Sequence, residues 1–230
     1  NLYKTPKGEV IADKVAELVE SVYSNDKINV HLNTKIETVD GFVGSFTAKL
    51  NENGEDKTLE HGVSIMATGA KPYQPEEYMY GKDSRILTTF EMDEKMKTDD
   101  ALVKDADCAA FIQCVGSREP ERPYCSRVCC THSIDNALEL KRRKPDMNVF
   151  ILYRDIRTYG EREYLYKEAR DAGVIFVRYD VDNKPRVEQD GERLKITVKD
   201  HVLNRDIEIE PDVVSLASAI VPNKIDDLAQ

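Results

Sequence analysis

Four cysteines in one short segment are the residues best suited to chemistry in this sequence. Cys114, Cys125, Cys129 and Cys130 follow the spacing Cys-x10-Cys-x3-Cys-Cys within a segment that we name the cysteine loop, residues 114–130. Cysteine thiolates bind soft metals and iron–sulfur clusters, and they also carry out thiol–disulfide exchange. The chain has only five cysteines, so this cluster indicates metal or redox chemistry rather than a disulfide scaffold.

The surroundings of these thiols favour a [4Fe–4S] cluster. Each iron of such a cluster takes one cysteine sulfur, so four thiols can hold one cluster. Cys129 and Cys130 lie at the expected start of a helix, whose positive end favours thiolate over thiol. The charges of Arg118, Arg122 and Arg127 can offset those of the thiolates. Alternatives are a thiol–disulfide redox pair, ordinary packing, and a structural zinc site, whose usual paired C-x2-4-C knuckles are absent.

Other residues near the cysteine loop have simpler interpretations. Cys108 shares strand parity with Cys114, and we expect it to be a buried structural thiol. His132 follows the cysteine pair, and we expect a solvated histidine in a turn rather than one that tunes the cluster. Arg154 and Arg157 follow the next strand, where they would serve the cysteine loop or a subunit interface rather than a ribose phosphate.

The elements that must position these residues form two α/β halves. In the first half we expect a helix over 8–24, followed by strands over 28–32, 35–39, 44–50, 57–61 and 63–70. Asn53-Gly54 between two of these strands signals a hairpin turn.

The second half begins with an alternation of strands and helices. We expect strands over 109–115, 149–153 and 174–177, with helices over 133–143 and 161–172 between them. This βαβαβ order predicts a parallel sheet with right-handed crossovers. A meander over 186–188, 194–199 and 206–210 and a last strand over 212–216 complete this half.

A dinucleotide-binding domain would carry G-x-G-x-x-G after the first strand of this half, because only glycine lets the backbone approach a pyrophosphate. The cysteine loop stands there instead, with one glycine, Gly116, and with Pro120 and Pro123 in the approach. We therefore expect negligible NAD(P)H binding.

The repeated layout resembles that of flavoproteins with two dinucleotide domains. Ala67-Thr68-Gly69-Ala70 followed by Pro72 is similar to the segment that joins the FAD and NAD(P) domains of thioredoxin-reductase-like enzymes. The resemblance implies an α/β fold and a place for Ala67, Thr68 and Gly69 beside a flavin. It assigns residues 1–70 to a partial FAD-binding domain, 71–104 to a connector, 105–217 to a degenerate Rossmann-like domain of three-layer ββα character, and 218–230 to a return into the FAD domain.

Residues 111–118, 122–130 and 151–160 resemble the signature of the A-subunit family of heterodisulfide reductases. This resemblance implies an oxidoreductase component that relays electrons between FAD and a [4Fe–4S] cluster, in a complex with other subunits. In that family the positions of Cys114, Cys125, Cys129 and Cys130 hold the cluster. The chain departs from the family in having no cysteine over 40–66 and no G-x-G-x-x-G for FAD, so we expect this chain alone to bind FAD weakly and to be inactive.

Composition limits the other functions. A net charge of −10 argues against a general nucleic-acid role. No apolar run is long enough to span a bilayer, and no signal peptide is visible, so we expect a cytoplasmic protein. The chain opens on Asn1 rather than Met, and we expect a fragment of a longer protein. A homodimer is compatible with the sequence. Competing functions are an NAD(P)H-dependent flavin disulfide reductase and a non-enzymatic scaffold stabilised by zinc.

Overall fold

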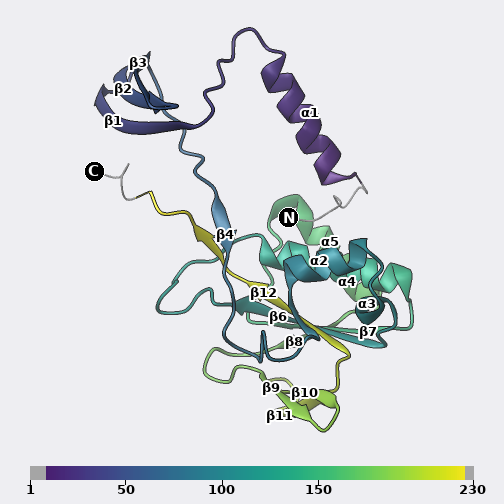
Figure 1. Cartoon of the computed structure of the whole chain (residues 1–230). Helices are drawn as coiled ribbons and strands as arrows, with labels where there is room; N and C mark the ends of the chain where they lie inside the picture. The colour runs from purple at the N-terminus through teal and green to yellow at the C-terminus, as the bar shows by residue number, and fades with distance from the viewer. Residues whose placement is uncertain (1–8, 226–230) are drawn as a thin grey trace. The chain divides into compact units, whose positions relative to one another are not determined.

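A parallel five-stranded sheet lies at the centre of the larger of two units in this computed structural model, which describes residues 9–225. The parts of the expected FAD domain over 1–8 and 226–230 lie outside the described residues. The larger unit comprises residues 9–11 and 72–221, and the smaller one comprises 12–71 and 222–225 (Figure 1).

The central sheet confirms the parallel architecture expected from the alternation of strands and helices. Its strands, in spatial order, are β5 (Ile86–Thr88), β12 (Val213–Ser218), β6 (Cys108–Val115), β7 (Asn148–Tyr153) and β8 (Ile175–Arg178). Every neighbouring pair is parallel, and Leu216 of β12 lies between Thr88 and Ile112. Strand β5 comes from residues 71–104, which the sequence assigns to a connector.

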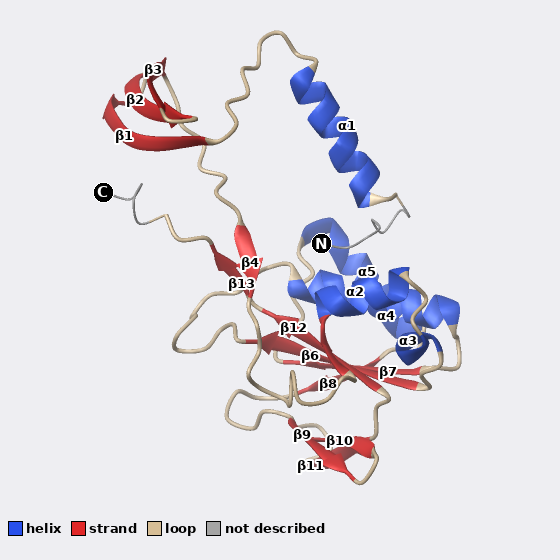
Figure 2. Ribbon diagram, in the orientation of Figure 1, coloured by secondary structure: helices blue, strands red, loops and turns tan. Residues whose placement is uncertain are grey.

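Helices cover one face of this sheet (Figure 2). They are α2 (Thr89–Lys97), the short α3 (Ala101–Lys104), α4 (Cys129–Arg143) and α5 (Glu163–Asp171), which follows a single turn of 3₁₀-helix over Gly160–Arg162. The fully buried Met92 and Ile134 pack with Phe111 and Ile151 of the sheet into one apolar core. A reciprocal pair of hydrogen bonds between Thr88 and Glu91 starts α2.

An antiparallel meander covers the opposite face of the sheet. It consists of β9 (Arg186–Asp190), β10 (Arg193–Asp200) and β11 (Arg205–Ile209). Leu194 and Ile196 of β10 are fully buried and pack with Ile112 and Leu152 of the sheet. Helices, parallel sheet and meander form three layers, which confirms the expected α/β fold of ββα character.

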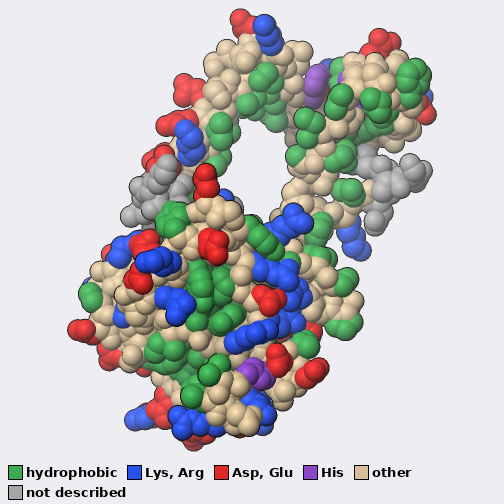
Figure 3. Space-filling view, turned by 180° about the vertical axis from the view of Figure 1, so that it is seen from behind, with side chains coloured by type: hydrophobic (Ala, Val, Ile, Leu, Met, Phe, Trp, Pro, Cys, Tyr) green, Lys and Arg blue, Asp and Glu red, His purple; other side chains and the backbone are tan. Residues whose placement is uncertain are grey.

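The smaller unit contains a helix and a second meander. Helix α1 (Ile11–Tyr23) is followed by β1 (Thr34–Phe42), β2 (Ser45–Glu52) and β3 (Glu55–His61). The hairpin between β2 and β3 is confirmed: Asn53 and Gly54 have φ of 55° and 91°, as a type I′ turn requires. Hydrophobic side chains lie exposed on both the helix and the meander of this unit (Figure 3), including Val15 and Leu18 of α1 and Phe42 of β1.

Two strands expected in this smaller unit are not formed. Residues 28–32 have no regular secondary structure, and over 63–70 only Ala70 is in a strand, the short β4 (Ala70–Pro72), which pairs with β13 (Ile220–Pro222). None of the described strands pairs with residues 63–69, where Val63 is 71% and Ile65 88% exposed. Apolar character alone does not make a strand, because the backbone groups of a strand need a neighbour.

No helix within residues 9–225 has the length and the apolar composition of a membrane-spanning segment.

Candidate functional site

The four clustered cysteines line one small pocket in the larger unit, which we call the thiol pocket. Cys114 is the next-to-last residue of β6, and Cys129 and Cys130 form the first turn of α4, which begins four residues earlier than expected. Cys125 approaches from the loop between these two elements. All four are free thiols, and Cys130 is buried. The structure thus brings together the four residues that the sequence singles out.

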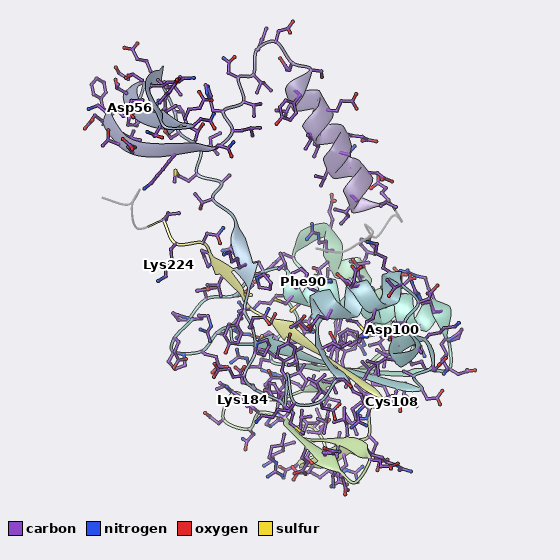
Figure 4. All side chains as sticks on the ribbon, viewed as in Figure 1. Asp56, Phe90, Asp100, Cys108, Lys184 and Lys224 are labelled. Atoms are coloured by element: carbon purple, nitrogen blue, oxygen red, sulfur yellow. The ribbon has the colours of Figure 1, made fainter. Side chains whose placement is uncertain are left out.

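Cys108 is excluded from this group. It is the first residue of β6, at the other end of the strand from Cys114, where it is half-buried (Figure 4). Burial and the nearby Asp212 carboxylate raise the pKa of the Cys108 thiol to about 11. The thiol therefore stays protonated at neutral pH, as expected of a structural cysteine.

The backbone of the cysteine loop has a shape unlike that of a glycine-rich phosphate turn. Cys114, Arg118 and Arg127 all have left-handed φ values, of 61°, 59° and 64°. Gly116 is also left-handed, with φ of 67°, and a Cβ at this position would overlap the Tyr73 ring. Only glycine fits there, because the ring occupies the space that a side chain would need.

Two arginines hold this loop in place. Arg122 donates from Nε to the carbonyl oxygen of Gly116, and its guanidinium lies 4.2 Å from the centroid of the Tyr73 ring. Arg154 is only 8% exposed and donates to the carbonyl oxygens of Ser117 at 2.7 Å and Arg118 at 3.3 Å. The expectation that Arg154 serves the cysteine loop is therefore confirmed.

Two of the three arginines expected beside the thiols line the thiol pocket. Arg118 and Arg127 line the pocket, whereas Arg122 does not, and Arg157 lies there as well. Arg118 Nη1 is 4.0 Å from Cys114 Sγ, and the amide nitrogen of Arg127 donates to Cys125 Sγ at 3.4 Å. These donors suit thiolate sulfur, because hydrogen bonds to ligating sulfurs stabilise their negative charge.

A carboxylate that the sequence analysis missed also lines the thiol pocket. Asp155 Oδ2 accepts from Arg118 Nη2 at 2.7 Å and from Arg157 Nη2 at 3.4 Å. Burial is the largest single influence and acts to raise the pKa of Asp155, but Arg118 and Arg157 together outweigh it, so the pKa lies below its ordinary value. The position of Asp155 just beyond the carboxyl end of β7 is the signal that could have identified it, since sites in parallel sheets lie at that edge.

Burial opposes the stabilisation of thiolates that is expected from the helix end. Burial, reinforced by the neighbouring thiols, raises the pKa of Cys129 to about 12, and burial raises that of Cys130 to about 11. Both thiols instead donate to carbonyl oxygens, Cys129 to Ser218 at 3.6 Å and Cys130 to Asp155 at 3.7 Å. Binding of a metal group to these thiols would therefore release protons.

The donor set fits an iron–sulfur cluster. Within residues 9–225, no three His, Cys, Asp or Glu side chains lie close enough together to hold a single metal ion. A cubane bonds its four thiolates to four different irons, so its ligands surround a volume rather than converge on one point. Four thiols around one pocket, with Arg118, Arg127 and Arg157 beside them, match this requirement in number, softness and charge.

His132 has an environment that the sequence did not predict. It is buried, and its Nε2 lies 2.6 Å from Asp93 Oδ2. Asn136, one turn further along α4, donates to the other oxygen of Asp93 at 2.8 Å. The expectation of a solvated histidine was wrong because α4 begins at Cys129, which directs position 132 toward α2. This triad fixes α4 against α2 behind the thiol pocket.

Cys114 also lines a larger, open pocket of about 460 Å³. Tyr78, Tyr179 and Val187 contribute to its walls, together with Lys184. Cys114 therefore contributes to both the thiol pocket and a pocket of the size that small molecules occupy.

Ala67, Thr68 and Gly69 lie in the smaller unit, where all three are exposed. Asn223 holds the last two: its Nδ2 donates to Thr68 O at 2.8 Å and its backbone nitrogen to Gly69 O at 3.2 Å. Contact of this segment with a flavin remains a prediction.

Comparison with known proteins gives consistent relatives. No family model matches the chain. The A subunit of H2:CoB–CoM heterodisulfide, ferredoxin reductase from Methanothermobacter thermautotrophicus is 34% identical over 192 residues, which are 76% of this chain and 28% of that protein. The iron–sulfur A subunit of CoB–CoM heterodisulfide reductase from Methanocaldococcus jannaschii is 31% identical over 198 residues, 78% of this chain and 30% of that protein. The chain thus spans less than a third of these relatives.

Solved structures support the fold. Thioredoxin reductase of T. acidophilum matches with a TM-score of 0.50 and 15% identity, over 98% of this chain and 64% of that one. An FAD-bound cadaverine monooxygenase of Erwinia amylovora matches with a TM-score of 0.52 and 8% identity, over 94% and 58%. At these identities the likeness concerns the fold alone, which is thioredoxin-reductase-like.

Proposed function

The chain is homologous to one segment of the A subunits of heterodisulfide reductases, and from this premise we propose that it is the cluster-holding part of an electron-transfer flavoprotein. In this proposal one [4Fe–4S] cluster is held by the four cysteines of the thiol pocket, Cys114, Cys125, Cys129 and Cys130. The observation that carries the proposal is that these four thiols, from a strand end, a loop and a helix start, line one pocket.

The residues of the chain have definable tasks in such a relay. When bound, the cluster supplies one-electron chemistry. The cysteines would hold it as thiolates, and the amide of Arg127 and the guanidinium of Arg118 would donate to ligating sulfurs. Arg154 and Arg122 keep the loop in the shape that brings Cys114 and Cys125 to the same pocket.

The flavin belongs to the whole protein in this proposal. Residues 1–70 and 218–230 would contribute to an FAD-binding domain, with Ala67, Thr68 and Gly69 beside the flavin. The segment 105–217 would be the degenerate nucleotide domain that carries the cluster. The relatives are named as subunits of heterodisulfide reductases, so we propose other subunits of a similar complex as partners in electron transfer.

Elemental analysis of anaerobically prepared chain tests the proposal. After reconstitution with iron and sulfide, we expect about four irons and about four sulfides per chain. One zinc per chain with no sulfide would favour the scaffold alternative and contradict the proposal. Micromolar affinity for NADH or NADPH in a calorimetric titration would favour the NAD(P)H-dependent reductase, because the cysteine loop stands where the phosphate-binding turn would be.

A further inference from the structure

Asp155 connects two sides of the thiol pocket. Its carboxylate oxygen Oδ2 lies 2.7 Å from Arg118 Nη2, on the cysteine loop, and its backbone oxygen accepts from Cys130 Sγ at 3.7 Å, at the start of α4. The other terminal nitrogen of Arg118, Nη1, lies 4.0 Å from Cys114 Sγ. Asp155, Arg118 and Cys114 thus form a chain of contacts from the end of β7 to the end of β6.

The placement of Arg118 depends on this contact. Its side chain is 24% exposed, and the carboxylate with which it forms an ion pair is that of Asp155. An arginine side chain loses rotamer entropy when it is held in one position. Without an acceptor at position 155, the guanidinium would be free to turn toward solvent, away from Cys114.

A guanidinium near a ligating sulfur affects the reduction potential of a cluster. Reduction adds one negative charge, and a nearby positive charge stabilises the reduced state more than the oxidised one. Hydrogen bonds to ligating sulfur act in the same direction. Arg118 is therefore expected to raise the potential, and its effect depends on its distance from Cys114.

We propose that Asp155 is a positioning residue that holds Arg118 against Cys114 and thereby keeps the reduction potential of the cluster high. This inference rests on the proposed function. In this inference Asp155 raises the reduction potential through Arg118. Its own negative charge acts in the opposite direction, because a carboxylate beside a cluster by itself disfavours reduction.

The opposite signs make the proposal testable with the reconstituted 230-residue chain. The measurement is the midpoint potential, from a redox titration followed by electron paramagnetic resonance, with iron content determined for each variant. Asp155→Ala should shift the potential to lower values, and Arg118→Gln should do the same. In the Arg118→Gln background, Asp155→Ala should instead raise the potential, because the effect of its charge then outweighs that of its longer contact with Arg157, at 3.4 Å. Asp155→Glu should restore most of the original value.

Glu119→Ala is the matched control. Glu119 is the neighbour of Arg118 on the cysteine loop, but its carboxylate pairs with Lys184 at 2.9 Å and, more distantly, with Arg154 at 3.8 Å, and it does not line the thiol pocket. Removing its charge should leave the potential unchanged or raise it.

The results separate this inference from the proposed function. A wild-type chain that takes up no iron would overturn both. If all variants hold equal iron and Asp155→Ala raises the potential or leaves it unchanged, only the positioning role is refuted. Loss of iron in Asp155→Ala but not in Arg118→Gln would also refute it, because Asp155 would then be needed to assemble the pocket.

Discussion

Arg154 Nη2 lies 2.7 Å from the carbonyl oxygen of Ser117, which ties the end of β7 to the cysteine loop. The same guanidinium also donates to Arg118 O at 3.3 Å, and the Arg154 carbonyl accepts from Arg178 at 3.2 Å. In an ordinary nucleotide domain the polar residues at this edge of the sheet face a ligand. Here a buried arginine instead satisfies the carbonyl groups of the loop that replaces the phosphate turn.

Arg154→Lys should therefore destabilise the loop even though it keeps the charge. A lysine cannot reproduce the planar fork that reaches both carbonyl oxygens. We expect the free energy of unfolding to fall by about 1.5–3 kcal/mol, the range for hydrogen bonds to charged groups, in urea denaturation of the metal-free chain. Arg205→Lys, on the exposed end of β11, is the control and should change little. Equal stabilities of the two variants would show that Arg154 does not hold the loop.

Serine substitutions test the ligand set. Replacing any one of Cys114, Cys125, Cys129 or Cys130 by serine should remove most of the iron or convert the cluster to a smaller form, because each iron needs its thiolate. Iron and sulfide content and the visible absorption spectrum measure this. Cys108→Ser is the matched control and should retain the cluster, since Cys108 lies at the other end of β6. A chain that keeps its cluster without Cys114 but loses it without Cys108 would contradict the assignment.

Gly116→Ala should distort the cysteine loop. The residue has φ of 67°, and an added Cβ would overlap the Tyr73 ring. A strained left-handed residue costs about 1–3 kcal/mol, which thermal unfolding of the metal-free chain can measure. Gly116→Ala should lower stability less in a Tyr73→Ala background than in the original chain, because the overlap is gone while the φ strain remains. Full additivity of the two changes would mean that the ring does not limit this position.

The sequence predicts most of the larger unit because its strands are long apolar runs between amphipathic helices. Ile112 and Ile151 lie in such runs, and both are fully buried. Strand β5 was missed because Ile86–Thr88 is too short for a periodic pattern. The strands expected over 28–32 and 63–70 were predicted from apolar character alone, which says nothing about whether a neighbouring strand is present.

The sequence predicts the four thiols of the pocket but not the contacts of the residues around them. Cysteine spacing identifies the four thiols because they lie within one short loop. The contact between His132 and Asp93 joins residues 39 positions apart, so no local pattern predicts it. The pairing of Arg118 with Asp155 likewise depends on β6 and β7 being neighbours in the sheet, which the sequence implies only at the level of topology.

Asp135 gives the fold a dependence on pH that is independent of the cluster. It is 8% exposed on α4, and within the described residues neither carboxylate oxygen has a hydrogen-bond partner. Burial raises the pKa of Asp135 from 3.8 to about 6, although Arg142 and His132 act in the opposite direction. The folded state therefore binds this proton more tightly than the unfolded state does.

It follows that this carboxyl should make the protein less stable as the pH rises from about 4 to about 6, and that the full loss should persist at pH 7. Asp135→Asn removes the titrating group, so it should raise the free energy of unfolding at pH 7 by on the order of 3 kcal/mol and leave stability at pH 4 nearly unchanged. Urea denaturation at a series of pH values measures this. Asp171→Asn, an exposed carboxylate on α5 that pairs with Lys167, is the control and should show no such gain. A stability difference between Asp135→Asn and the original chain that does not vary between pH 4 and pH 7 would show that Asp135 is not the group responsible.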